Sequence, residues 1–242
     1  MERELPASIE IAWGIRERSG KGPRRGLSLN KIVEAAVEVA LSEGLAAVSM
    51  GRIATELGAA TMSLYRYVAT KDELLVLMVD SVFSPPTASV SRERWRAALA
   101  RWAREHLAVL RRNPWVVRVP LSGPPITPNQ VVWFERGLWS MRNTGLTEGE
   151  KVSVLLLING FVRNQALLEA DLQMAAGKDS TAADAMSSYG RLLSRLIDPE
   201  RFPAIHAAIA SGIFDQRDES DADFTFGLER ILDGVDALVR QR

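Results

Sequence analysis

The sequence predicts an all-α protein with two helical domains, and three observations support that fold class. Apolar residues recur at intervals of three and four along almost the whole chain of 242 residues, which is the spacing of one helix face. No run of useful length alternates apolar and polar residues as a half-buried strand would. Capping residues and Gly or Pro breaks separate the periodic segments, as expected at helix ends.

Capping residues divide the front of the chain into short helices. Ser28 and Ser49 are placed to cap two of them, and Gly44 and Gly58 to end them. A Ser hydroxyl accepts a backbone N–H that has no partner within the helix, and Gly adopts the conformation that ends helices. We expect the front helices over residues 28–44, 49–58, 61–68 and 70–84.

The last front helix marks a domain boundary. It opens with a T-x-x-E capping box, Thr70 and Glu73, and Pro85-Pro86 ends it. We therefore expect a flexible basic arm over 1–27, a front domain over 28–84 and a rear domain over 85–242. The rear helices are expected near 92–112, 114–120, 127–144, 148–175, 181–197, 200–211 and 223–240.

The third front helix has two distinct faces. Leu64 and Val68 share one face, while Met62 and Arg66 share the opposite one. Together with the Gly-containing break before it, this is the plan of a helix-turn-helix, whose recognition helix packs its back on the domain and turns its front to base edges. A plain amphipathic helix fits the periodicity equally well.

The stretch from Ser28 to Phe83 resembles the DNA-binding domain of the tetracycline-repressor (TetR) family of bacterial transcription regulators. The resemblance rests on AVSMGRIATELGAATMSLYRYVATKDELLVLMVD, and above all on the spacing I-A-x-x-L-G followed by L-Y-x-Y-V-x-x-K-x-x-L. Behind it, LRRNPWVVRV and GLTEGEKVSVLLLINGFVRNQALLEA are similar to the family's ligand-binding and dimerisation domains. This implies a repressor released from a palindromic double-stranded DNA operator when a small molecule binds the rear domain.

The resemblance also assigns DNA contacts to residues of this chain. The positions that face bases in the major groove hold Thr61, Met62, Ser63 and Arg66. The positions that usually contact phosphates hold Ser49, Tyr65, Tyr67 and Lys71. Arg66 suits a bidentate bond with a guanine, and Met62 suits a thymine methyl group. The alternatives are packing for Tyr65 and a solvated side chain for Lys71.

Two positions depart from the family pattern. Ala60 stands where the family commonly has a capping Ser or Thr, whose loss costs about 1 kcal/mol, so we expect the recognition helix to start from Thr61. Gly51 stands where some members carry a base-reading side chain. The arm, unless it is a solvated tail, supplies further candidates for a minor groove or phosphates: Lys21, Arg24 and Arg25. The apolar residues within 5–15 are expected to dock on the body or on a partner.

Two rear helices are predicted to form a dimer interface. The helix from 148 is apolar on all sides between Val152 and Val162, which predicts burial. The helix over 223–240 carries an apolar stripe: Phe224, Leu228, Ile231, Leu232, Val235, Leu238 and Val239. In the resembled family these regions pair as a four-helix bundle, so we expect a homodimer through 148–175 and 223–240. A dimer would place two recognition helices about 34–36 Å apart on the duplex.

The helices near 92–112 and 127–175 carry many large aromatic and polar side chains. An apolar cavity with a few polar groups is how proteins bind small molecules, so we expect a pocket for a small apolar or aromatic effector. The candidate lining residues are Trp102, His106, Trp115, Trp133, Phe134, Phe161, Asn164 and Gln165. The alternative for each aromatic residue is ordinary core. Magnesium–tetracycline recognition is not expected, because Val82-Phe83 and residues 117–121 stand where the family's namesake has histidines.

Composition and motifs argue against a disulfide-bonded protein, a metalloprotein and an enzyme. The chain has no Cys and two His, so we expect no disulfide, no metal and no cofactor. Phosphate-loop, G-x-S-x-G and H-E-x-x-H motifs are absent, which leaves an all-helical enzyme as the least supported alternative. A constitutive dimeric DNA-binding protein without an effector stays open. The first residues mix acidic and basic side chains, which is not typical of a secretory signal. The longest apolar stretch, between Lys151 and Arg163, has 11 residues and is too short to span a membrane. We therefore expect a cytoplasmic protein.

The formal charge of zero conceals an uneven distribution. Residues 21–71 carry seven basic and four acidic side chains, whereas 119–242 carry twelve basic and seventeen acidic ones. This polarity would turn the front toward DNA and predicts modest, salt-sensitive, dimer-dependent binding. Residues 92–118 carry eight basic and two acidic side chains. That belt is either a solvated face or a partner for the acidic run from Asp215 to Asp223.

Overall fold

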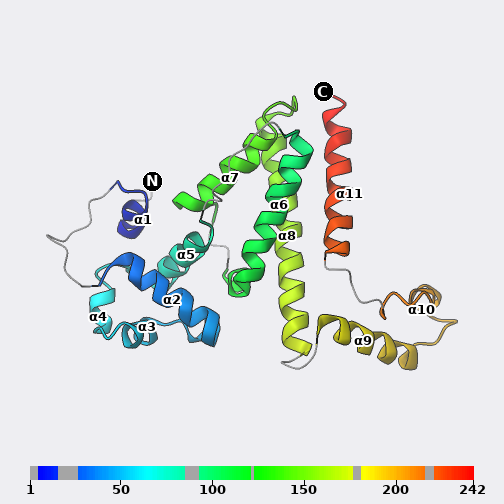
Figure 1. Cartoon of the computed structure of the whole chain (residues 1–242), viewed down its shortest axis with the longest axis horizontal. Coiled ribbons are helices and arrows are strands. Elements are labelled where there is room, and N and C mark those ends of the chain that lie inside the picture. Colours follow the sequence, from blue (N-terminus) through cyan, green and yellow to red (C-terminus); the bar gives the residue numbers. More distant parts are fainter. Residues whose placement is uncertain (1–4, 16–26, 85–92, 121–122, 177–180, 216–220) are drawn as a thin grey trace.

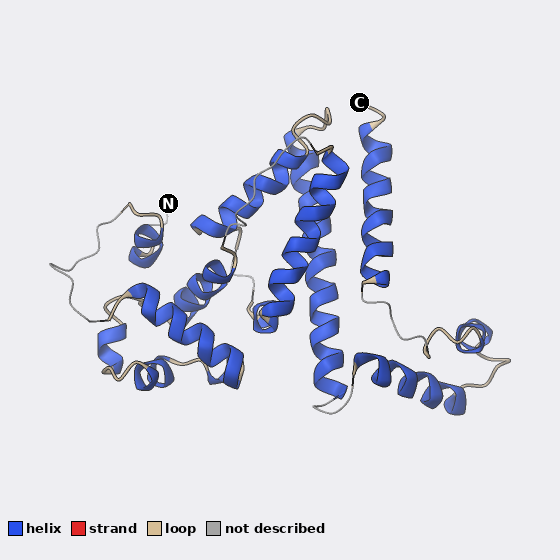
Figure 2. Cartoon of the chain, viewed as in Figure 1, coloured by secondary structure: helices blue, strands red, loops and turns tan. Residues whose placement is uncertain are grey.

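The fold is described from a computed structural model that places residues 5–15, 27–84, 93–120, 123–176, 181–215 and 221–242. Every regular element in these ranges is helical (Figure 2), which confirms the all-α class. The elements are α1 (Ala7–Ala12), α2 (Leu29–Glu43), η1 (Leu45–Ala47), α3 (Met50–Glu56), α4 (Thr61–Leu64), α5 (Lys71–Val82), α6 (Trp95–Arg112), η2 (Pro114–Arg118), α7 (Pro128–Ser140), α8 (Glu148–Ala176), α9 (Ala182–Leu196), α10 (Pro203–Ala210) and α11 (Ala222–Val239).

Figure 1 shows two groups of helices. Helices α2 to α5 form the front group, with α1 beside them, and α6, α7, α8 and α11 form the body of the rear group. Side-chain caps set the starts of front helices, as predicted. The Ser28 hydroxyl accepts the Lys31 N–H at 3.3 Å, and the Ser49 hydroxyl accepts the Arg52 N–H at 3.2 Å. Helix α2 ends at Gly44, whose φ of 87° suits glycine.

The predicted capping box of α5 forms only in part. The Thr70 hydroxyl accepts the Glu73 N–H, as expected. The Glu73 carboxylate, however, accepts the N–H of Ala69 at 2.7 Å instead of that of Thr70. It also accepts the hydroxyl of Ser8 in α1. Glu73 therefore joins α5 to the N-terminal segment.

The apolar N-terminal segment docks on the rest of its own chain, which is one of the two alternatives predicted for residues 5–15. Ser8 and Ile9 of α1 are buried, Ile9 with 2% of its surface exposed. Beyond the helix, the Trp13 Nε1–H donates to the carbonyl oxygen of Ile126 at 2.7 Å. Helix α1 thus touches the front group through Glu73 and the loop before α7 through Ile126.

The prediction that the helix from 148 is buried on all sides is wrong for α8. Ile158 and Val162 on one side are fully buried, where the helix packs against α6 and η2. On the other side Leu156, Leu157 and Leu168 have 66%, 55% and 50% of their surfaces exposed. Among the described residues, neighbouring elements therefore cover one side of α8, and apolar side chains on the other side stay exposed.

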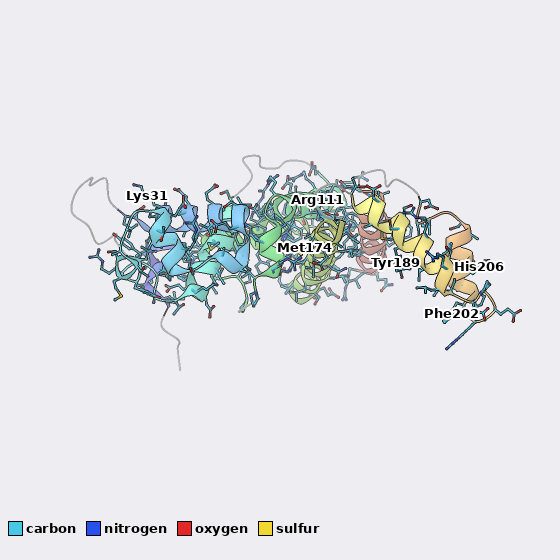
Figure 3. The ribbon with its side chains drawn as sticks, turned by 90° about the horizontal axis from the view of Figure 1, so that it is seen from below. Lys31, Arg111, Met174, Tyr189, Phe202 and His206 are labelled. Atoms are coloured by element: carbon cyan, nitrogen blue, oxygen red, sulfur yellow. The ribbon has the colours of Figure 1, made fainter. Side chains whose placement is uncertain are left out.

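Helices α9 and α10 extend from the end of α8 and reach beyond the body of the rear group (Figures 1 and 3). These two helices and the loop between them expose a series of large apolar side chains: Tyr189, Leu192, Leu196, Phe202 and Ile205. Apolar surface of this kind usually marks an interaction site. Within the described ranges no helix, these included, is long and apolar enough to cross a membrane.

The basic belt of α6 is largely paired with acidic residues. Arg96 forms ion pairs with Glu229 and Asp233 of α11. Arg111 binds Asp221 at 2.5 Å, at the start of α11. The belt therefore meets the predicted acidic run at Asp221, and further along the chain it holds α6 against α11.

Candidate nucleic-acid interface and effector site

The recognition element is shorter than the predicted helix over 61–68. Helix α4 is a single turn, Thr61–Leu64, followed by a turn over residues 65–67. No side chain caps its N-terminus at Ala60, in keeping with a start from Thr61. One turn without a cap forms few internal hydrogen bonds, so its shape depends on the packing behind it.

The predicted two faces are present in this element. Leu64 and Val68 have none of their surface exposed, whereas Met62 is 75% exposed and Arg66 is also exposed. The other two predicted base-reading residues, Thr61 and Ser63, are half-buried. A buried apolar back and a front that is exposed to a partner are what a recognition element needs.

The predicted phosphate contacts lie at the starts of α3 and α5 and in the turn after α4. Ser49 begins α3, Lys71 begins α5, and both are exposed, as is Tyr65 with 45% of its surface. Tyr67 has a structural role as well, because its hydroxyl donates to the carbonyl oxygen of Leu27 at 3.0 Å. That bond ties the recognition turn to the chain entering α2.

Two neighbouring positions on α3 differ in their availability to DNA. Gly51 is exposed, with no atom within 4 Å of where a Cβ would lie. Arg52 is held between Glu43 at 2.6 Å and Glu56 at 2.8 Å, so it braces α3 against α2. The predicted arm contacts lie outside the described residues: Lys21, Arg24 and Arg25.

Three of the predicted effector residues meet in one aromatic cluster, made of Phe83, Trp102, His106 and Trp133. The His106 ring lies 5.0 Å from that of Phe83, 5.4 Å from Trp102 and 5.7 Å from Trp133, between ring centroids. The Trp102 Nε1–H donates to the Trp133 carbonyl at 2.9 Å, and the Trp133 Nε1–H donates to the Phe83 carbonyl at 2.8 Å. These bonds join α6, α7 and the end of α5.

Two polar ring nitrogen atoms of the rear group are buried and have no hydrogen-bond partner among the residues that the structure describes. They are the Nδ1 atom of His106 and the Nε1 atom of Trp115. Burial, helped by the charge of Arg163, lowers the pKa of His106 to about 4, so the imidazole is neutral near pH 7. A buried polar group without a partner costs about 1–3 kcal/mol, so in a native protein it needs an explanation, such as a functional role or a bound water molecule.

The remaining predicted pocket residues lie elsewhere in the rear group. Phe161 stacks on Phe224 of α11, with centroids 5.4 Å apart, and Phe134 is half-buried against the core. Asn164 is exposed, since the 100° step per residue places it on the same side of α8 as the exposed Leu157. Gln165 donates to Glu169 at 3.0 Å. These four residues are therefore not part of the aromatic cluster.

The sequence analysis missed Asp80 and Phe83, which connect the two groups of helices. Asp80 is 6% exposed, and its carboxylate accepts the Gln130 N–H at 3.0 Å in the first turn of α7. The Asn129 side chain donates to the Asp80 carbonyl at 3.0 Å. Burial raises the pKa of Asp80. An acidic residue three positions after Leu77, within an apolar stripe, was the available signal.

Comparison with known proteins decides the family. Residues 32–78 match the family described as "Bacterial regulatory proteins, tetR family", and residues 89–239 match "Tetracyclin repressor-like, C-terminal domain". The chain belongs to the TetR family. Members of this family are DNA-binding transcription regulators that dimerise, and they are not enzymes.

This TetR-family regulator has similar relatives in actinobacteria. It is 40% identical to the HTH-type transcriptional repressor DrrR1 of Streptomyces coeruleorubidus over 243 residues, covering 99% of this chain and 88% of the relative. It is 27% identical to Streptomyces coelicolor ActR in complex with actinorhodin, with a TM-score of 0.73 over 88% of this chain and 97% of that one. BioQ with its double-stranded DNA operator is 21% identical, with a TM-score of 0.53 over 60% and 89%, a likeness of fold alone.

Proposed function

We propose that this TetR-family regulator is a dimeric repressor that binds a palindromic operator through α4 and leaves it when a small aromatic molecule binds the rear group. The observation that carries the proposal is the pair of hydrogen bonds from Trp102 to Trp133 and from Trp133 to Phe83. A molecule that displaces Trp133 must also displace the end of α5. Helix α5 packs on α2, α2 on α3 and α3 on α4, so a displacement of α5 is passed to the recognition element through these contacts.

Operator reading rests on the exposed side chains of the recognition element. Arg66 carries the donors for a guanine, and Met62 supplies an apolar contact. Repression is supported by DrrR1, whose name describes a repressor. Thr61 and Ser63 complete the proposed base-reading set, while Ser49, Tyr65, Tyr67 and Lys71 contact phosphates.

The proposed effector is aromatic and carries at least one hydroxyl group. The rings of the aromatic cluster provide flat apolar faces, and ActR has been crystallised with actinorhodin and with (S)-DNPA. Neutral His106 has an Nδ1 atom without a partner, and Trp115 has an N–H without one. An effector hydroxyl that donates to the first or accepts from the second would remove part of the cost of burying them.

The proposed dimer pairs the open sides of α8 and α11. Leu156, Leu157 and Leu168 of α8 are exposed, as is Phe226 of α11 with 66% of its surface. Gly234, also exposed, would let a partner helix approach closely. Two-fold pairing of these sides would bury the apolar surface that a single chain leaves open.

Selection of genomic DNA by the purified protein, followed by a thermal-shift screen of aromatic compounds that includes actinorhodin, tests the proposal. We expect the selected sites to share an inverted repeat, and hydroxylated aromatic compounds to raise the melting temperature. Selected DNA without a two-fold repeat would contradict the proposal that the protein binds a palindromic operator. A screen in which only non-aromatic compounds bind would contradict the proposal that the effector is aromatic.

A constitutive DNA-binding dimer is the second candidate, and one observation favours it. The four rings of the aromatic cluster are in direct contact, with Trp102 and Trp133 6.4 Å apart between centroids, as in an ordinary core. If no compound in the screen binds while the operator is held tightly, this second function is the correct one.

A further inference from the structure

A cavity of about 420 Å³ lies between the front and rear groups of helices. Its walls come from α1, α2, α5 and α7, and none of the four aromatic-cluster residues lines it. The volume falls within the range of small-molecule sites, about 300–1,000 Å³. The cavity is thus distinct from the effector site proposed above.

The chemistry of the walls favours one class of molecule. Leu29, Val33 and Leu77 provide buried apolar surface, while Asp80 and Glu34 provide carboxylates. Among the described residues that line the cavity, none is Lys, Arg or His. Burial raises the pKa of Asp80, but its carboxylate and that of Glu34 give the cavity a negative potential when they are ionised, and the apolar part of the walls strengthens the field. A molecule that suits these walls has an apolar body and a positive charge.

Helix α1 closes one side of the cavity with Ile11 and Ala12. It is fixed at both ends, by Ser8 on Glu73 of α5 and by Trp13 on the carbonyl of Ile126. It also lies before residues 32–78 and 89–239, the segments that match the family. The wall is therefore supplied by a segment outside those matched domains.

We infer that the cavity between α1, α2, α5 and α7 is a second ligand site, which takes a small organic cation with an apolar body. Its ligand touches the front group at Glu34 and Asp80 and the rear group at Asn129 in the same site. Such a ligand holds the two groups in one relative orientation and so alters operator affinity. This regulatory consequence rests on the proposed repressor function, whereas binding itself does not.

Calorimetric titration of the full-length dimer with tryptamine and with tryptophol tests the inference. The two molecules share an indole ring and differ in an ammonium group against a hydroxyl. We expect tryptamine to bind about tenfold more tightly, because its charge lies close to Asp80 and Glu34 in a partly enclosed site. The Glu34→Gln variant, isosteric and on an exposed residue, should reduce that ratio several-fold.

A variant that fills the cavity provides a second test of the inference. Ser81→Phe places a ring at the lining residue Ser81 of α5 and should abolish tryptamine binding. Ser42→Phe is the matched control, because Ser42 is also exposed and also donates to a carbonyl of its own helix, and it lies outside the cavity. Melting curves of both variants confirm that they fold.

Each outcome decides the inference. Equal affinities for the two molecules, absence of tryptamine binding, or binding that survives Ser81→Phe would overturn it. Binding as expected with operator affinity unchanged would keep the site and remove its regulatory role. Failure of the protein to select any operator would count against the proposed function and leave the ligand site standing.

Discussion

The recognition element and the aromatic cluster place their functional groups in opposite environments. In the recognition element, Met62 and Arg66 are exposed on the side opposite its buried back, where the proposed function places DNA. In the aromatic cluster, His106 is enclosed by three rings with its Nδ1 atom unpaired. The side chains proposed to contact DNA are thus already exposed, whereas the aromatic cluster contains a buried group that a ligand would satisfy. This difference is consistent with a DNA-binding element whose operator affinity is controlled by ligand binding in the rear group.

The largest expected contrast lies within the recognition element itself. Leu64→Ala removes a fully buried side chain and should lower the free energy of unfolding by about 2–5 kcal/mol. Met62→Ala changes an exposed side chain and should alter stability by less than about 0.5 kcal/mol, while weakening operator binding. Urea unfolding and operator titration of both variants measure the two effects. Equal losses of stability would show that the two faces are not distinct.

The second prediction concerns His106 and pH. In the unfolded chain the His pKa is near 6.5, and in the fold it is lowered to about 4. Between these values the unfolded state binds a proton that the folded state does not. The contribution of His106 is therefore fully retained above pH 6.5 and is lost as pH falls toward 4, by about 3 kcal/mol in total.

His106→Phe should remove this pH dependence while keeping an aromatic ring in the cluster. Urea unfolding of wild type and variant at pH 7 and at pH 4.5 measures the difference. His206→Phe, on an exposed residue of α10, is the control and should leave the dependence as it is in wild type. Parallel pH profiles for wild type and His106→Phe would mean that His106 is not held neutral.

The third prediction separates base reading from phosphate contact. Arg66→Ala should cost about 1–3 kcal/mol of operator binding and relax one base position, whereas Lys71→Ala should weaken all sequences and reduce the salt slope by about one. Binding to selected and scrambled duplexes over a range of salt measures both. If the two variants behave alike, the division of roles between Arg66 and Lys71 is wrong.

The smallest expected effect is at Gly51. Because nothing lies within 4 Å of a Cβ there, Gly51→Ala should stabilise α3 by about 0.5–1 kcal/mol through its helix propensity. A thermal melt detects the gain. Destabilisation would show that the space around Gly51 is needed by the fold.

Sequence reasoning succeeded where the signal is local. Ser28 and Ser49 cap their helices, because a cap depends on residues three positions away. It failed where the contact is distant: the Asp80 carboxylate meets Gln130, fifty residues further on. Asn164 was misplaced because apolar residues surround α8, so periodicity could not tell the side that faces α6 from the side that stays open. Only packing against the neighbouring helices settles that question.

The most direct test of the account is reciprocity between effector and operator. The operator affinity of the dimer would be measured with and without the tightest aromatic ligand from the screen, and the ligand affinity with and without operator. The account predicts that each partner weakens the other by the same factor, and that Trp133→Phe, which removes the bond to the Phe83 carbonyl, reduces that factor. A ligand that binds tightly in the rear group and leaves operator affinity unchanged would contradict it.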